Sequence, residues 1–138
     1  MGVRSLLLAA CALLVVACSS EGNVFSLEVG QCFDQPDGDT VQNVEIVDCD
    51  DSFDAEVFAL FDLPGGDFPG AEEAASSAFD GCLSRFEPYV GIDYFESEIF
   101  LDALFPTAES WEQDDREVVC FLFEPNVRLQ GSQQGAAR

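Results

Sequence analysis

The chain has 138 residues, with 27 acidic residues against five Arg and with no Lys or His, so its formal net charge is −22. This length allows one compact domain and excludes most multidomain enzymes, and the charge repels phosphate polymers, so no nucleic-acid partner is expected. Hydrophobic residues make up 48% of the chain and include 13 Phe, which excludes compositional disorder and predicts a packed core.

The first 17 residues follow the pattern of an export signal. Arg4 supplies a positive charge before an apolar run of about a dozen residues, which is too short for a membrane span of roughly 20. Val15-Val16-Ala17-Cys18 resembles the lipobox of bacterial lipoproteins, in which the Cys is acylated. We expect residues 1–17 to be removed, Cys18 to carry the lipid and residues 18–22 to form a tether. An ordinary signal peptide is the alternative.

One domain is predicted over residues 23–128, followed by a polar tail over residues 129–138. Alternating hydrophobicity and turn residues predict five strands, over residues 24–29, 41–47, 54–63, 97–105 and 117–124.

The pattern changes its period after the third predicted strand. One face of a helix is predicted to carry Ala71, Ala75, Ala78, Cys82 and Phe86, spaced by three or four residues. Pro88 disfavours helical backbone at Glu87, so the helix is expected to end there. A short helical turn is expected over residues 107–113. This order of elements predicts an α+β domain with a mainly antiparallel sheet of about five strands packed on one principal helix.

Four cysteines remain once Cys11 leaves with the signal and Cys18 takes the lipid. An even number in an exported domain predicts two disulfides, for which three pairings exist. The sequence contexts of the cysteines favour Cys32 with Cys49, across a loop rich in turn residues, and Cys82 with Cys120, between the helix and a strand. A zinc site is the competing use, but close Cys pairs and His are missing from the sequence.

Several short motifs resemble the septum formation domain of actinobacterial envelope proteins. They are, in order, Val29-Gly30-Gln31-Cys32-Phe33, Val47-Asp48-Cys49 with Asp54-Ala55-Glu56-Val57-Phe58, Gly81-Cys82, and residues 109–120. The resemblance covers nearly the whole predicted domain and implies a cell-envelope location and a link to septum formation. It implies no reaction and no catalytic residue. Members of the family usually carry His where this chain has Phe53.

The residue types argue against the commonest nucleophile–base pairs. The chain lacks His, and every Cys is assigned to the signal, the lipid or a disulfide. Paired carboxylates remain as an alternative, in a small envelope hydrolase, but 27 acidic residues make any single pair uninformative.

Two groups of residues are candidates for ligand binding. Trp111 beside Arg116 is a candidate ligand or partner surface, whereas the structural interpretation is a Trp that caps the core next to a paired Arg. The acidic cluster of Asp48, Asp50, Asp51 and Asp54 is a weak calcium candidate in a cation or ligand sensor, because it does not match the twelve-residue loop pattern. Solvated acidic turns are the simpler interpretation, so we expect no metal and no cofactor.

The sequence therefore predicts a noncatalytic, lipid-anchored domain outside the cell. We expect it on the outer face of the cytoplasmic membrane, bound to an envelope protein or a wall polymer.

Overall fold

The computed structural model of the chain describes residues 20–23, 26–35 and 43–138. The predicted signal over residues 1–17 and the predicted acylation site Cys18 lie outside these ranges, as do positions 24–25 and 41–42 of the first two predicted strands. Across the described ranges, no helix has the length and apolar character needed to cross a membrane.

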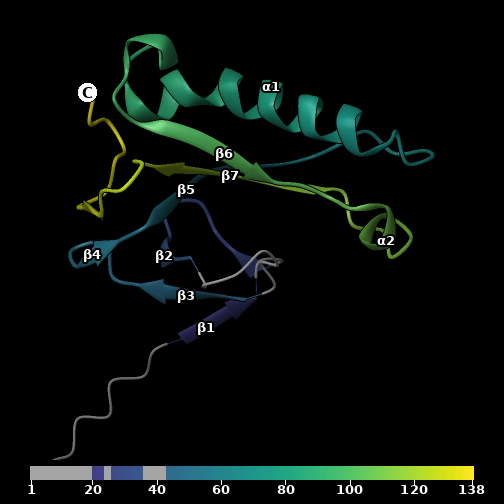
Figure 1. Cartoon of the computed structure of the whole chain (residues 1–138), viewed down its shortest axis with the longest axis horizontal. Helices are drawn as coiled ribbons and strands as arrows, with labels where there is room; N and C mark the ends of the chain where they lie inside the picture. The colour runs from purple at the N-terminus through teal and green to yellow at the C-terminus, as the bar shows by residue number, and fades with distance from the viewer. Residues whose placement is uncertain (1–19, 24–25, 36–42) are drawn as a thin grey trace, which may run out of the picture.

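One antiparallel sheet of six strands dominates the fold (Figure 1). Its spatial order is β1 (Ser20–Asn23), β3 (Asn43–Val47), β2 (Cys32–Asp34), β5 (Ala55–Asp62), β7 (Glu117–Phe123) and β6 (Phe100–Leu104). All five neighbouring pairs are antiparallel. A second, two-stranded sheet joins β4 (Ser52–Phe53) to β8 (Leu129–Gln130). The predicted α+β fold with a mainly antiparallel sheet is confirmed.

The N-terminal edge of the sheet differs from the prediction. None of residues 26–30 lies in a strand; residues 29–30 form a turn, in which the Gln31 N–H donates to the Glu28 carbonyl at 3.1 Å. The edge strand is β1, which pairs with β3 and contains Ser20 to Gly22 of the predicted tether. This pairing satisfies backbone N–H and C=O groups along β3. It joins segments about twenty residues apart in sequence, and hydrophobic alternation within one segment does not predict such a contact.

Helix α1 (Ala71–Val90) lies across one face of β5, β7 and β6 (Figure 1). Its buried face repeats every four residues, at Ala74, Ala78, Cys82, Phe86 and Val90, so the prediction was right for the last three predicted positions but wrong for Ala71 and Ala75. The helix also continues beyond Pro88, and Gly91 ends it in the left-handed conformation by donating its N–H to the Glu87 carbonyl at 2.8 Å.

The C-terminal residues explain why the helix outlasts the proline. The N–H groups of Gly135 and Ala137 donate to the carbonyls of Tyr89 and Val90 at 2.8 and 2.9 Å. They thereby satisfy carbonyls that a helix end leaves without partners. Residues 129–138 are therefore part of the folded domain, and their assignment to a separate polar tail was wrong.

Two hydrophobic cores lie on the two faces of the sheet. The first fills the space under α1, around Phe58, Phe86 and Leu122. The second includes Phe33 of β2, Val44 of β3 and Phe121 of β7. The Phe33 and Phe121 rings lie only 5.8 Å apart although β5 separates their strands. The sheet therefore curls so that β2 and β3 cover the face opposite α1.

The two predicted disulfides are confirmed. Cys32 and Cys49 join with their Cα atoms 5.3 Å apart, beside the buried side chains of Phe53 and Leu129. Cys82 and Cys120 join with their Cα atoms 5.5 Å apart, and both are fully buried in the core under α1. The second bond fixes the middle of α1 to the centre of the sheet.

Replacement of both Cys82 and Cys120 by Ala is expected to lower the free energy of unfolding by about 4 kcal/mol, because the bond closes the longer loop of the two. The matched pair, Cys32→Ala with Cys49→Ala, is expected to lower it by about 3 kcal/mol. Urea unfolding of the oxidised proteins measures both changes. A loss below roughly 1 kcal/mol for the Cys82 pair would contradict the role given to this bond.

Candidate functional site

Trp111 and Arg116 lie together, as the sequence suggested. Trp111 is the last residue of α2 (Ala108–Trp111), which begins with a capping box formed by Thr107 and Ser110. The Arg116 guanidinium carbon lies 3.8 Å from the centre of the indole ring, and Arg116 donates to the Trp111 carbonyl at 2.8 Å.

The indole has little surface left for a ligand. Trp111 is 6% exposed, its Nε1 donates to the Gly66 carbonyl at 2.9 Å, and Phe68 packs edge-on at 5.6 Å between ring centres. Arg116 also lies 3.8 Å from the exposed carboxylate of Asp114. These contacts favour the structural interpretation, in which the indole of Trp111 packs into the core and the Arg116 guanidinium covers its outer face in a cation–π contact.

The four acidic residues of the cluster near Cys49 do not converge on one point. Asp48 accepts a hydrogen bond from the Asp50 N–H at 2.9 Å, within a turn closed by the Asp51 N–H on the Asp48 carbonyl. Asp54 turns instead toward Arg128. In the ranges that the structure describes, no three Cys, Asp or Glu side chains come together in a way that would hold a metal ion.

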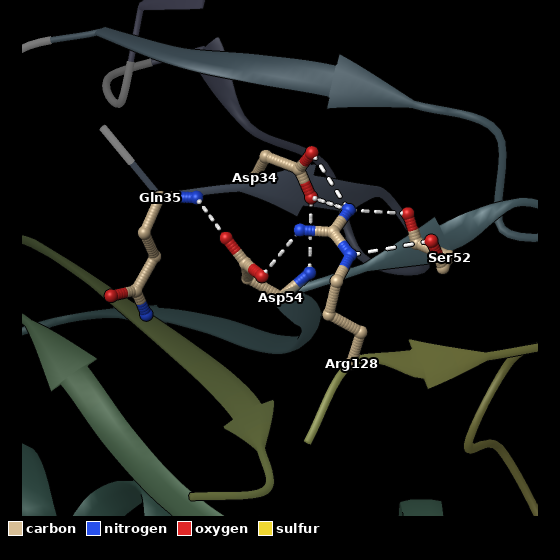
Figure 2. A network of polar contacts seen from close by, with 5 residues as sticks. All are labelled: Asp34, Gln35, Ser52, Asp54 and Arg128. Carbon is tan, nitrogen blue, oxygen red and sulfur yellow. Dashed lines mark hydrogen bonds and ion pairs between the residues drawn. The ribbon is translucent and has the colours of Figure 1, made fainter. Parts of the chain in front are cut away.

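Arg128 is the centre of a polar network that the sequence analysis missed (Figure 2). Its Nη2 lies 2.8 Å and 2.9 Å from the two Asp34 oxygens, and its Nη1 lies 2.7 Å from Asp54 Oδ1. The side chain and the carbonyl of Ser52 accept two more bonds. The hydrogen bond to Asp34 raises the pKa of the Arg128 guanidinium. The network connects β2, β4 and the start of the C-terminal segment.

A shallow pocket of about 310 Å³ lies beside this network. Residues 123–128 line it together with Gln35 and Asp54. Its charged groups are two carboxylates, of Asp54 and Glu124, and the already paired Arg128. The pocket therefore gives an anion no unpaired positive charge, and neither Trp111 nor Arg116 contributes to it.

Glu56 forms a second network, inside the protein. Its side chain is fully buried, and its Oε1 accepts from the Tyr89 hydroxyl at 2.8 Å and from the Ser132 hydroxyl at 2.6 Å. Its Oε2 accepts from the Gln133 N–H at 2.6 Å. Burial, followed by the hydrogen bond to Glu56, raises the pKa of the Tyr89 phenol well above 10.0. Tyr89 therefore remains a protonated donor to the carboxylate at neutral pH.

A sequence signal for this network existed but was incomplete. Glu56 is an acidic residue in the third predicted strand, between apolar Ala55 and Val57, and a buried carboxylate requires donors. The pattern did not indicate that residues 132 and 133 would supply two of them, because these residues had been assigned to a solvated tail.

One further carboxylate shows a shifted pKa. Burial, assisted by the nearby charges of Asp62 and Asp115, raises the pKa of Glu117. Glu117 stands opposite Asp62 in the register of β5 and β7, and it does not line the pocket beside Arg128.

The fold and these networks define a small disulfide-bonded α+β domain whose C-terminal segment is tied back onto the sheet. The family model described as septum formation matches residues 17–127. The chain therefore belongs to the septum formation family, and this membership supports a role related to septum formation. No curated protein and no solved structure matches the chain.

Replacement of Glu56 by Gln is expected to lower the free energy of unfolding by roughly 2 kcal/mol or more. The NH₂ group of Gln cannot accept a hydrogen bond, so it would face one of the donors that now bind the carboxylate, such as the Tyr89 hydroxyl or the Gln133 N–H. Urea unfolding at neutral pH measures the change. The matched control, Glu45→Gln on an exposed position of β3, is expected to change it by less than about 0.5 kcal/mol. Equal effects of the two substitutions would contradict the proposed anchoring role of Glu56.

Proposed function

We propose that this protein is a noncatalytic, lipid-anchored domain on the outer face of the cytoplasmic membrane. It binds another component of the cell envelope, a protein or a wall polymer, in connection with septum formation.

The contrast between its polar and its apolar side chains carries this proposal. The Arg116, Arg128 and Glu56 side chains form contacts within the domain. Every buried side-chain N or O atom in the described ranges has a hydrogen-bond partner. Large apolar side chains, in contrast, remain at the surface, and Phe95 is 82% exposed. Polar groups that hold the fold together and apolar groups that face outward suit a binding domain better than a reactive site.

Export to an oxidising compartment is supported by the two disulfides, because such bonds persist outside the cytoplasm and are rare inside it. The lipid anchor is supported by the sequence before Cys18. The charge of −22 gives the chain no electrostatic attraction to an anionic membrane surface, so a place at the membrane would depend on the lipid.

An anchor on Cys18 would lie close to β1. Only Ser19 separates Cys18 from Ser20, the first residue of β1. Two steps of 3.8 Å between Cα atoms bring an acylated Cys18 within about 8 Å of the sheet. The domain would then lie close to the lipid headgroups through its β1 edge, with α1 at the far end of the molecule in Figure 1.

The proposal predicts two results for the native host. Intact mass of the wild-type protein is expected to show an N-terminal acylated Cys18, and Cys18→Ser is expected to prevent acylation. Cys11→Ser is the matched control, because it changes a Cys of the same apolar run and is expected to leave acylation intact. An unmodified wild-type N-terminus would contradict the anchor.

Partner binding is tested in the same cells by photo-crosslinking, since a chain without Lys is poorly suited to amine-reactive reagents. A photoreactive Phe analogue placed at exposed positions across the surface, at Phe95, Val29 and Val127, is expected to capture an envelope protein or wall polymer from at least one position. No capture above background at any of the three would contradict the proposed binding function.

A further inference from the structure

Strand β6 forms one edge of the six-stranded sheet. In the described part of the chain it pairs with β7 alone, so its other side has no neighbouring strand. The Ala103 N–H donates to the Asp102 carboxylate at 2.8 Å, so we take it to face the open side of β6. Because backbone groups alternate along a strand, the Leu101 N–H faces the same open side as that of Ala103. The edge therefore presents backbone groups that a further strand is able to pair with.

Exposed aromatic side chains gather along this edge. Phe95 is 82% exposed just before β6, Phe100 is 45% exposed within it, and Phe105 is 37% exposed just after it. The half-exposed ring of Phe79 on α1 lies 6.4 Å from Tyr94, next to Phe95. Four of the six exposed large apolar side chains in the described ranges thus lie on or beside residues 94–105.

The two faces of β6 differ in character. Leu101 and Ala103 belong to the core under α1, which also includes Tyr94. Phe100 and Asp102 project from the opposite face by the alternation of the strand. A strand added at this edge would meet Tyr94, Leu101 and Ala103 on the α1 face, and Phe100 with the Asp102 carboxylate on the other.

Charge selects the kind of segment that fits. Between Arg85 and Arg116 the chain has no basic residue, while Glu96, Glu98 and Asp102 are exposed next to the edge. Arg138 reaches Glu98 only at 3.8 Å and lies closer to Glu124, at 3.2 Å. A second copy of this chain would bring a further charge of −22 to the same edge, so repulsion disfavours self-association there.

We propose that the β6 edge, residues 94–105, binds an extended segment of a partner protein in which basic and apolar side chains alternate. The segment pairs with β6 as an additional strand, its apolar side chains meet Tyr94 and Phe95, and a basic side chain takes the Asp102 carboxylate away from the Ala103 N–H. This inference rests on the proposed binding function, and it names the surface and the chemistry of the partner.

The test uses the full-length protein in a mild nonionic detergent with its disulfides intact. The probe is a capped synthetic peptide of about ten residues in which Val and Lys alternate, long enough for one strand. Comparison peptides replace every Lys by Glu or carry N-methyl groups on every Val or on every Lys. N-methylation removes pairing donors from one edge of the peptide and leaves its charge unchanged, so the protein itself needs no substitution.

The Val–Lys peptide is expected to bind and to protect the Leu101 amide from hydrogen exchange. At least one of the two N-methylated peptides is expected to bind about tenfold more weakly, because strand pairing is lost, and the Val–Glu peptide is expected to bind at least as weakly. Phe95→Ala is expected to weaken binding by about fivefold or more. Val29→Ala, which removes an exposed apolar side chain far from β6 in sequence, is expected to have no effect.

Four results would overturn the inference. Two concern affinity: both N-methylated peptides, or the Val–Glu peptide, bind as tightly as the Val–Lys peptide. The third is protection of β1 amides from hydrogen exchange in place of the Leu101 amide. The fourth is sedimentation or vesicle flotation that shows a second copy or a lipid surface covering Phe95. Photo-crosslinking in cells distinguishes failure of the β6-edge inference from failure of the proposed binding function. Capture at Val29 but not at Phe95 rejects the β6 edge and retains partner binding, whereas no capture at any position rejects both.

Discussion

The buried carboxylate of Glu56 is the contact on which the rest of this structure depends. A charge removed from water is tolerated only when donors surround it, and the Glu56 carboxylate accepts from three. One donor comes from the end of α1, and two come from the C-terminal segment, more than seventy residues away in the chain. The domain therefore cannot bury β5 without also bringing α1 and residues 132–133 to the same point.

This requirement explains several other features. The C-terminal segment is held at Arg128 by the carboxylates of Asp34 and Asp54, and at Arg138 by Glu124. Between Arg128 and Arg138, its backbone completes the end of α1. Arg116 lies over Trp111 and Arg85 over Phe61, so four of the five Arg side chains of the sequence form contacts within the domain. The exposed side chains at the β6 edge are, in contrast, acidic and aromatic.

The sequence predicted the features that local patterns encode. Hydrophobic patterning and turn residues located β5 and β7. The contexts of the cysteines selected the correct disulfides. Family resemblance was also visible in short motifs such as Gly81-Cys82 and residues 109–120. The helix face was predicted correctly at Ala78, Cys82 and Phe86 and wrongly at Ala71 and Ala75. In the first turns Ala71, Ala74 and Ala75 are all alanine, so hydrophobicity does not distinguish the buried one.

The missed features depend on contacts between distant residues. Pro88 disfavours helix locally, yet Tyr89 and Val90 remain helical because Gly135 and Ala137 bond to their carbonyls. A polar segment after residue 128 has no hydrophobic period, so its docking on Glu56 left no pattern to detect. The Arg128 network was missed for the same reason, since its acidic partners lie 74 and 94 residues away.

Native-state hydrogen exchange of the C-terminal amides tests most directly whether the Glu56 contact makes residues 129–138 part of the folded domain. We predict that the N–H groups of Gln133, Gly135 and Ala137 exchange only through the global unfolding that also exposes core amides such as Val57. Rapid exchange of these three amides through local fraying, with the Val57 amide still protected, would contradict it.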